Sequence, residues 1–412
     1  MPPANTPPAT PVTPTRTVAA ARIPLLAITL GAAAGALTAL VLWLMQALSA
    51  VLWSHSGAWW STFLTIMVGG VLLVLLHHLS RRTSVDESLG EQIAETRDQL
   101  GTYRSAALIT AASAIVAVGF GGAIGPEAGI IAVVGQLGAL VSYRLARSRA
   151  EARLLSDIGT AGALGGLYGS PPGGAVAADE AEATPRWQLF LAGLAGLIGF
   201  AATAGVILPG HGLRLPLPEV TPSGRATDIL AATLPALLGA LAGLAFTALL
   251  PLVQAALSRI GGASVQILLG TSLFALLASA WPILRFSGHH ELQDLAQFAA
   301  DVGPWALLGV AGLKILALCL CLASGWKGGA AFPLLFIGAA IGLAVHLVLP
   351  GISPTVALVA AMSAALTAGI GKPLAGALVS ALILGLPAVG PLCLGIAAGW
   401  GASKLAPSNS LH

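Results

Sequence analysis

Residues 121–130 read GGAIGPEAGI, and the carboxylate of Glu127 stands there in the middle of an apolar region. No other residue between Arg104 and Arg144 is charged. At the centre of a membrane helix a charged side chain costs about 2.5–3.5 kcal/mol on insertion scales, so an ionisable residue there indicates a functional site. The Gly-Pro pair before it is a helix-start signal, because proline at the first helical position lacks only an N–H that would be unpaired anyway. The stretch predicts a helix that begins within the membrane with Glu127 in its first turn, where the helix dipole also favours an acidic residue.

The composition is that of an integral membrane protein. Of the 412 residues, 56% are hydrophobic and 8% are charged, and the mean hydropathy is +0.89, whereas roughly 25% of the residues of soluble domains are charged. Apolar runs such as 24–53 exceed the about 20 residues that a membrane helix needs, and they lack the alternation of a barrel strand. The basic residues cluster beside apolar runs, which is the positive-inside pattern and not a nucleic-acid footprint. We therefore expect an all-α polytopic protein of the cell membrane, in contact with the lipid bilayer and not with nucleic acid.

The chain is expected to form one membrane domain, residues 23–404. A disordered tail rich in Pro and Thr precedes it at 1–22, and a short tail without a regulatory domain follows at 405–412. The 51 glycines and 26 prolines indicate helices that start or stop within the membrane. Such interruptions are tolerated only where the freed backbone groups are buried in protein or line a cavity.

An internal repeat supports this organisation. Residues 163–176, ALGGLYGSPPGGAV, align with residues 365–378, ALTAGIGKPLAGAL. A second glycine-rich break lies upstream of each, GGAIGP at 121–126 and GGAAFP at 328–333. Interrupted helices at corresponding positions of two halves are typical of a transporter binding site. We expect a first repeat of about residues 60–208 and a second of about 228–403.

The breaks predict an anion site. A helix that begins within the membrane presents unpaired N–H groups and a positive end, which together bind anions. The Glu127 carboxylate can occupy that site itself, and its protonation would remove the charge and let it swing away. In the second break, the N–H groups of Ala330, Ala331 and Phe332 are expected to face the same anion. Lys327 either adds positive potential or lies at the membrane interface.

Other polar residues have simpler interpretations. Cys319, Cys321 and Cys393 are interpreted as small buried hydrophobic residues, because they lie in apolar segments without metal-binding spacing. Lys314 either raises the potential of the anion route or pairs with a carbonyl or carboxylate group. Neither a metal site nor a cofactor is predicted. The chain also has no HExxH or GxSxG motif, which argues against an enzyme.

These motifs resemble those of the CLC family of chloride channels and proton-coupled anion antiporters. The segments 125–129 and 324–333, and the pair 169–174 and 371–376, correspond to the family's signatures in order and spacing. The likeness is strongest to the bacterial subgroup of CLC-related ion-transport proteins. It implies two inverted-topology repeats of tilted, membrane-interrupted helices, and a homodimer with one anion pore in each subunit. It also implies that Glu127 is the gating glutamate, with an anion bound near Pro126, Glu127, Ala128, Ala330, Ala331 and Phe332.

The chain departs from the family at four places. The family's phenylalanine in the second motif falls on Ala331, with Phe332 one place later. The first anion motif should fall near 83–90, which reads TSVDESLG, so that Ser84 or Ser88 would replace the anion-binding serine. The family's pore tyrosine near the C-terminus has no counterpart, because the only tyrosines are Tyr103, Tyr143 and Tyr168. The family's inner glutamate falls on Ala181. Glu180 or Glu182 would then line a proton path, unless the acidic cluster is a solvated helix end.

The predicted function is transport of a small inorganic anion, chloride first, by a channel or a proton-coupled antiporter. A cation or organic-solute carrier would need several intramembrane carboxylates or unwound carbonyl sites, whereas this chain offers one carboxylate and positive helix ends. The alternative kept open is secondary transport of another solute, such as fluoride or an organic anion.

Overall fold

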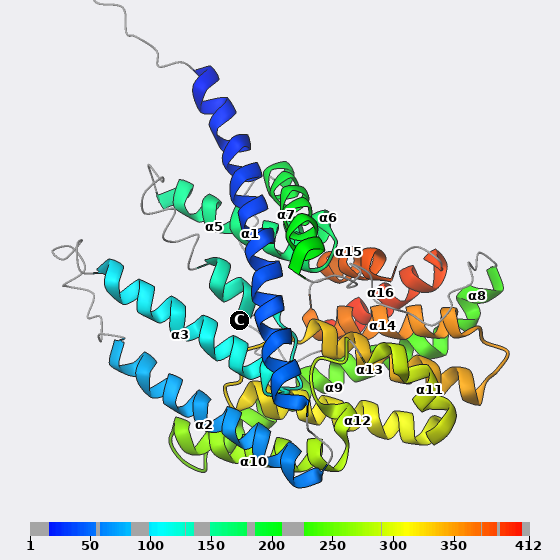
Figure 1. Cartoon of the computed structure of the whole chain (residues 1–412). Coiled ribbons are helices and arrows are strands. Elements are labelled where there is room, and N and C mark those ends of the chain that lie inside the picture. Colours follow the sequence, from blue (N-terminus) through cyan, green and yellow to red (C-terminus); the bar gives the residue numbers. More distant parts are fainter. Residues whose placement is uncertain are drawn as a thin grey trace, which may run out of the picture.

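The computed structural model describes residues 16–54, 58–83, 99–127, 129–135, 149–178, 186–207, 226–289, 291–371, 373–384 and 388–405. Helices account for nearly all of these residues, and they cross one another at many angles (Figure 1). The prediction of an all-α protein is confirmed. In the part of the chain described, the sole strand-like pairing is an isolated bridge between two glycines.

The helices fall into two series along the chain. The first series comprises α1 (Arg16–Trp53), α2 (Trp59–Thr83), α3 (Gln99–Gly119), α5 (Arg149–Leu167), α6 (Pro171–Ala178) and α7 (Arg186–Ile207). Residues 127 and 129–135, between α3 and α5, are also helical. The second series comprises α8 (Ala226–Ala231), α9 (Thr233–Ser258), α10 (Ala263–Ala280), the short 3₁₀ helix η1 (Pro282–Leu284), α11 (Leu292–Val302), α12 (Pro304–Ala323), α13 (Ala331–Val348), α14 (Pro354–Ile370), α15 (Pro373–Ile383) and α16 (Val389–Ser403).

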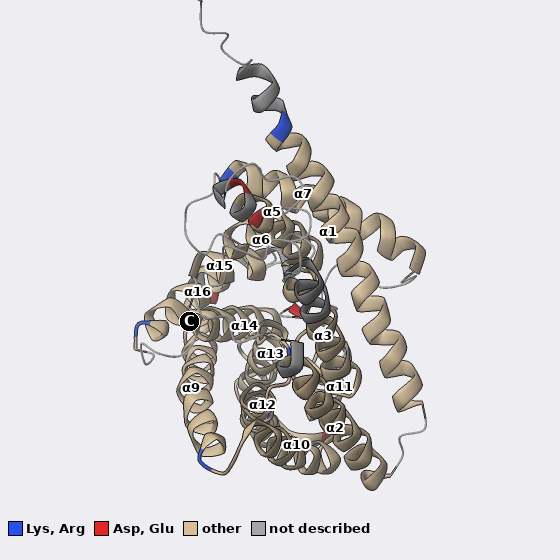
Figure 2. Ribbon diagram, turned by 90° about the vertical axis from the view of Figure 1, so that its left-hand side faces the viewer, with Lys and Arg blue, Asp and Glu red and all other residues tan. Residues whose placement is uncertain are grey.

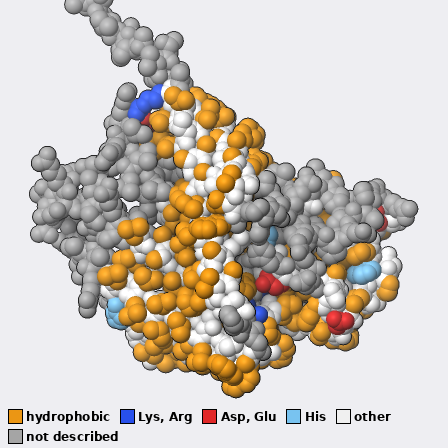
Figure 3. Space-filling view, in the orientation of Figure 1, with side chains coloured by type: hydrophobic (Ala, Val, Ile, Leu, Met, Phe, Trp, Pro, Cys, Tyr) orange, Lys and Arg blue, Asp and Glu red, His pale blue; other side chains and the backbone are white. Residues whose placement is uncertain are grey.

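The outside of the molecule is suited to lipid. Seven described helices are long and apolar enough to cross a membrane. Large apolar side chains cover much of the face shown in Figure 3, and charged residues are few and lie mostly near helix ends (Figure 2). The protein is therefore an integral membrane protein. The helix α1 already begins at Arg16, inside the segment 1–22 for which we expected disorder, and residues 1–15 and 406–412 lie outside the described part.

Glycines bring the helices of the first series into close contact. The helices α1, α5 and α7 pack against one another, with α1 running alongside α7 in Figure 1. A Cβ atom on Gly35 would overlap the Gly196 carbonyl, and one on Gly196 would overlap the Gly162 carbonyl. Because lipid gives no hydrophobic drive for helix association, such backbone contacts supply the packing energy.

Gly196→Ala tests this packing. The added methyl group meets the backbone of α5, so we expect the free energy of unfolding to fall by about 1–3 kcal/mol, as for other overpacked sites. Tryptophan fluorescence during heating in detergent measures the loss. Gly205→Ala is the matched control on α7, since a Cβ atom there meets nothing within 4 Å. Equal melting temperatures for the two variants would contradict the assignment.

The helices α13 and α14 form the centre of the second series. Every residue of α13 from Ala331 to Val345 is buried, and so is every residue of α14 from Thr355 to Gly369. The helices α9, α12 and α16 pack around this pair. A helix that is hydrophobic on all sides and buried on all sides needs neighbours on every face. The start of α13 therefore lies inside the protein.

The internal repeat is confirmed at the level of the helices. The helices α6 and α15 begin at the aligned prolines of the repeat, Pro171 and Pro373. The aligned glycines, Gly169 and Gly371, have φ of 61° and 71°, a left-handed conformation that glycine adopts without strain. The two helices also pack against each other. The repeats therefore meet at corresponding positions.

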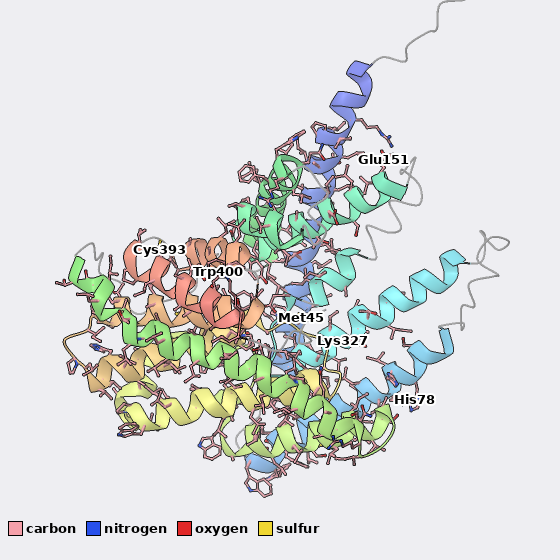
Figure 4. All side chains as sticks on the ribbon, turned by 180° about the vertical axis from the view of Figure 1, so that it is seen from behind. Met45, His78, Glu151, Lys327, Cys393 and Trp400 are labelled. Carbon is pink, nitrogen blue, oxygen red and sulfur yellow. The ribbon has the colours of Figure 1, made fainter. Side chains whose placement is uncertain are left out.

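The prediction that all three cysteines are buried is wrong for one of them. Cys319 and Cys321 are buried, but Cys393 is exposed on α16, as is Trp400 farther along the same helix (Figure 4). One side of α16 packs on α14 and α9, and the other side lies on the surface. In a membrane protein the lipid-facing positions are apolar too, so an apolar segment does not reveal which of its residues are buried.

Candidate anion site

The two glycine-rich breaks of the sequence lie against each other in the centre of the molecule. The N–H of Gly125 donates to the carbonyl of Gly329 at 2.8 Å, and the N–H of Gly329 donates to the carbonyl of Gly125 at 2.8 Å. Ile124 packs where a Cβ atom on Gly328 would be. Segments about two hundred residues apart in the chain thus form one unit, as expected for a site between two repeats.

Glu127 lies at this junction and is buried, with 3% of its surface exposed. It is the first helical residue after the break, and the carbonyl of Pro126 accepts the first helical hydrogen bond, from the Ile130 N–H, at 3.0 Å. The side chain extends to the other break, where the N–H of Phe332 donates to Oε1 at 3.1 Å. The carboxylate of one break therefore caps the helix that starts at the other.

The backbone groups around the carboxyl group belong to two helix starts. Phe332 is the second residue of α13, and Ala331 is the first. The backbone N–H groups of Ala331 and of Glu127 itself also interact with the carboxyl group. Unpaired N–H groups in the first turn are the ordinary ligands of anions at helix N-termini. In this geometry two helix starts lie beside one carboxyl group.

The second carboxylate oxygen, Oε2, lies between two glycines. It is buried and has no hydrogen-bond partner among the described residues. A Cβ atom on Gly125 or on Gly329 would overlap it. We call the space bounded by Gly125, Gly329 and the Phe332 N–H the carboxylate seat. It is polar on the helix-end side, and only glycine leaves room for a negatively charged oxygen there.

A loop held by Lys314 covers the first break. The Lys314 ammonium is buried and donates to four successive carbonyls, those of Ile283 at 3.4 Å, Leu284 at 3.1 Å, Arg285 at 3.0 Å and Phe286 at 2.9 Å. Of the two interpretations of Lys314, the structure shows pairing with carbonyl groups. Since an ammonium carries three donors, sharing among four carbonyls satisfies the whole group.

The loop in turn supports the break that carries Glu127. The N–H of Phe286 donates to the carbonyl of Gly121 at 3.0 Å. Trp53 packs edge-on against Phe286 with ring centroids 5.7 Å apart, and its indole N–H donates to the carbonyl of Gly119 at 3.1 Å. Farther along the loop, the ring of His289 meets the ring of Phe332 at 5.2 Å. The loop therefore contacts both breaks.

The remaining predicted site residues are placed as follows. Pro126 has no N–H, so it sets the helix start but cannot donate to an anion. Ala330 is the N-cap residue of α13, and Lys327 is exposed beside the break (Figure 4). Four predicted positions and one alternative lie outside the described residues: Ser84, Ala128, Glu180, Glu182 and Ser88. Among the described residues, no group of three or more His, Cys, Asp or Glu is arranged to bind a metal ion.

Sequence reasoning missed two features of the site. The first is the glycine pair that forms the carboxylate seat, whose spacing in the chain gives no sign that the two glycines meet. The second is Tyr168, whose ring lies against that of Phe332 with centroids 6.0 Å apart. A signal for it exists, since the repeat carries Ile370 at the position aligned with Tyr168. At this aligned position the first repeat therefore carries a hydroxyl group, whereas the second repeat carries an apolar side chain.

Known proteins resemble the chain both in sequence and in fold. Residues 79–404 match the family model described as voltage gated chloride channel. The chain is 28% identical over 232 residues to the ion-transport protein YfeO of Salmonella schwarzengrund, covering 55% of this chain and 56% of that protein. It is 28% identical over 235 residues to YfeO of Escherichia coli, covering 55% and 54%. The matched region thus spans about half the length of these relatives.

Two solved structures show the same fold. A slow cyanobacterial Cl⁻/H⁺ antiporter superposes with a TM-score of 0.74 at 19% identity, covering 94% of this chain and 96% of the other. A CLC-type fluoride/proton antiporter gives a TM-score of 0.71 at 18% identity, covering 96% and 98%. The family model covers most of the chain, and the paired breaks that it includes form one buried site. The chain belongs to the voltage gated chloride channel family, the CLC family.

Proposed function

We propose that this protein transports a small inorganic anion, chloride first, across the membrane through the carboxylate seat that Glu127 occupies. The observation that carries the proposal is the hydrogen bond from the Phe332 N–H to Oε1 of Glu127 at the start of α13. A helix N-terminus binds a free anion through the same groups that hold this carboxylate. The glutamate is then a tethered anion that competes with the transported one.

The chemistry of the seat favours an anion over a cation. Backbone N–H groups of Glu127, Ala331 and Phe332 interact with the Glu127 carboxyl group. A cation would require carbonyl or carboxylate oxygens in their place. Membership of the CLC family and the likeness to the two antiporter folds also favour an anion as the transported ion.

Glu127 is proposed to gate the path by leaving the seat. Its charge-assisted hydrogen bond is strong while the group is ionised, and protonation weakens that bond and frees the side chain. Each departure would let an anion enter, so the rate would depend on pH. Whether the proton crosses the membrane with the anion distinguishes an antiporter from a channel, and the proposed proton path at Glu180 or Glu182 would serve the antiporter. We further propose a homodimer with one seat in each subunit, located in the cell membrane.

Glu127→Ala tests the gate. Without its carboxylate the seat is open to anions at every pH. The competing hydrogen bond to a charged group is worth about 1.5–3 kcal/mol, so apparent chloride affinity should rise by about tenfold or more. In chloride-loaded liposomes with a potassium ionophore, wild-type efflux should increase as the pH falls, whereas Glu127→Ala and Glu127→Gln should show little pH dependence.

Glu151→Gln is the matched control. This change also removes a carboxylate, but Glu151 lies on α5 and pairs with Arg22 at 2.8 Å (Figure 4). Its efflux and pH profile should equal those of the wild type. Fluoride and an organic anion are tested in the same liposomes, and a pH-sensitive dye inside them reports proton movement. If wild-type protein moves none of these anions, the proposed function is wrong.

A further inference from the structure

Tyr168 lies in the turn between α5 and α6. Its N–H continues the last turn of α5 by donating to the carbonyl of Leu164 at 2.9 Å. The next residue, Gly169, turns the chain with a φ of 61° before α6 begins. Tyr168 is 8% exposed. The turn therefore directs an aromatic ring into the protein and not towards lipid.

The ring of Tyr168 comes from a third segment of the chain and lies against the side chain of Phe332, a residue of the carboxylate seat. It packs against the ring of Phe332, whose N–H holds the Glu127 carboxyl group. Tyr168 and Glu127 also interact electrostatically. The α5–α6 turn thus adds a side chain beside a seat that the two glycine-rich breaks form from backbone groups.

The hydroxyl group of Tyr168 is available to a ligand. It forms no hydrogen bond with the residues that the structure describes, although a buried tyrosine hydroxyl usually has a partner. Oε2 of Glu127 likewise has no partner. The hydroxyl group of Tyr168 and Oε2 of Glu127 therefore both lie near Phe332. Neither has a hydrogen-bond partner among the described residues, and they do not bond each other.

We propose that the Tyr168 hydroxyl donates a hydrogen bond to the transported anion when Glu127 leaves the carboxylate seat, and that this bond contributes to anion selectivity. The proposal rests on the proposed function. The anion would be held by the Phe332 N–H on one side and by the hydroxyl group on the other. Such a donor favours a small, charge-dense anion such as chloride over a large one such as thiocyanate, because the hydrogen bond strengthens with charge density.

Tyr168→Phe tests the proposal, because it keeps the ring against Phe332 and removes only the hydroxyl group. Binding is measured calorimetrically on purified protein in which Glu127→Ala has opened the seat. Adding Tyr168→Phe should weaken chloride binding about tenfold, the loss of one hydrogen bond to a charged group, and should weaken thiocyanate binding less. The ratio of chloride to thiocyanate efflux from liposomes should fall in parallel.

Tyr103→Phe makes the same chemical change near the beginning of α3, whereas Glu127 follows the end of that helix. It should change neither affinity. If Tyr168→Phe disturbs folding, a ring-fluorinated tyrosine at position 168 replaces it. That residue keeps the ring and makes the hydroxyl group a stronger donor, so chloride binding should tighten.

Two results would overturn the proposal. Unchanged chloride affinity and unchanged selectivity, in a protein where Glu127→Ala does bind chloride, would show that Tyr168 only packs against Phe332 and would leave the proposed function standing. If neither the wild type nor Glu127→Ala binds or moves any anion, the proposed function fails, and this proposal fails with it.

Discussion

Gly125→Ala is expected to slow anion transport by roughly one to two orders of magnitude. The methyl group it adds would occupy the space of Oε2 of Glu127, which is also the space that an anion would enter. The backbone cannot move aside easily, because Gly125 is paired with Gly329 by two hydrogen bonds of 2.8 Å. Overpacking costs about 1–3 kcal/mol, which corresponds to a loss of roughly one to two orders of magnitude in occupancy of the seat. Gly329→Ala should act in the same way, because its Cβ atom would also meet Oε2.

Chloride efflux from liposomes measures this loss, and Gly135→Ala is the control. Gly135 lies on the helix that Glu127 begins, and a Cβ atom there meets nothing within 4 Å. The double variant Gly125→Ala, Glu127→Ala identifies the cause. It should stay slow, because the methyl group and not the carboxylate fills the seat. Efflux as fast as that of Glu127→Ala alone would show that the methyl group does not reach the anion path.

Lys314→Met is expected to cause the largest loss of stability. The change keeps most of the side-chain volume but removes the ammonium group that four carbonyls share. A buried polar group left without a partner costs about 1–3 kcal/mol, and several carbonyls lose theirs together. We expect the free energy of unfolding to fall by about 3 kcal/mol or more. Transport should also fall, because the loop that Lys314 holds is bonded to Gly121 through the Phe286 N–H.

Thermal unfolding followed by tryptophan fluorescence, together with efflux from liposomes, tests this role. The control is Lys404→Met, because Lys404 is exposed and its ammonium lies over the ring of Trp400 at 3.8 Å. An exposed substitution of this kind usually changes stability by less than about 0.5 kcal/mol. A Lys314→Met protein with the melting temperature of the wild type would show that the carbonyls find other partners.

Local sequence was sufficient to predict several parts of the fold and the site. The internal repeat of 163–176 and 365–378 was visible in the sequence, and the structure shows that α6 and α15 begin at its aligned prolines, Pro171 and Pro373. The Gly-Pro pair before Glu127 predicted its place in the first turn of a helix, and its isolated charge in an apolar stretch indicated a functional site. Each of these inferences depends on interactions between residues close together in the chain.

Other features needed the positions of distant segments. Lys314 could have served the anion route or the backbone, and only the folded loop 283–286 shows that it pairs with carbonyls. Cys393 was predicted to be buried and is exposed, since both environments of α16 are apolar and its sequence does not distinguish them. Nothing in the sequence around Tyr168 indicates that its ring lies against that of Phe332, because the two residues are far apart in the chain.

The amino-acid sequence alone established that this chain is a helical membrane protein with two repeats, helices interrupted by glycine and proline, and one acidic residue at such an interruption. Composition and local backbone chemistry are sufficient for those conclusions. The three-dimensional structure added that the two interruptions pair through Gly125 and Gly329, so that the Glu127 carboxylate reaches the Phe332 N–H, 205 residues away in the chain. The physical reason is that a helix end carries unpaired N–H groups wherever it lies, but the packing of all the helices together determines which acceptor it meets.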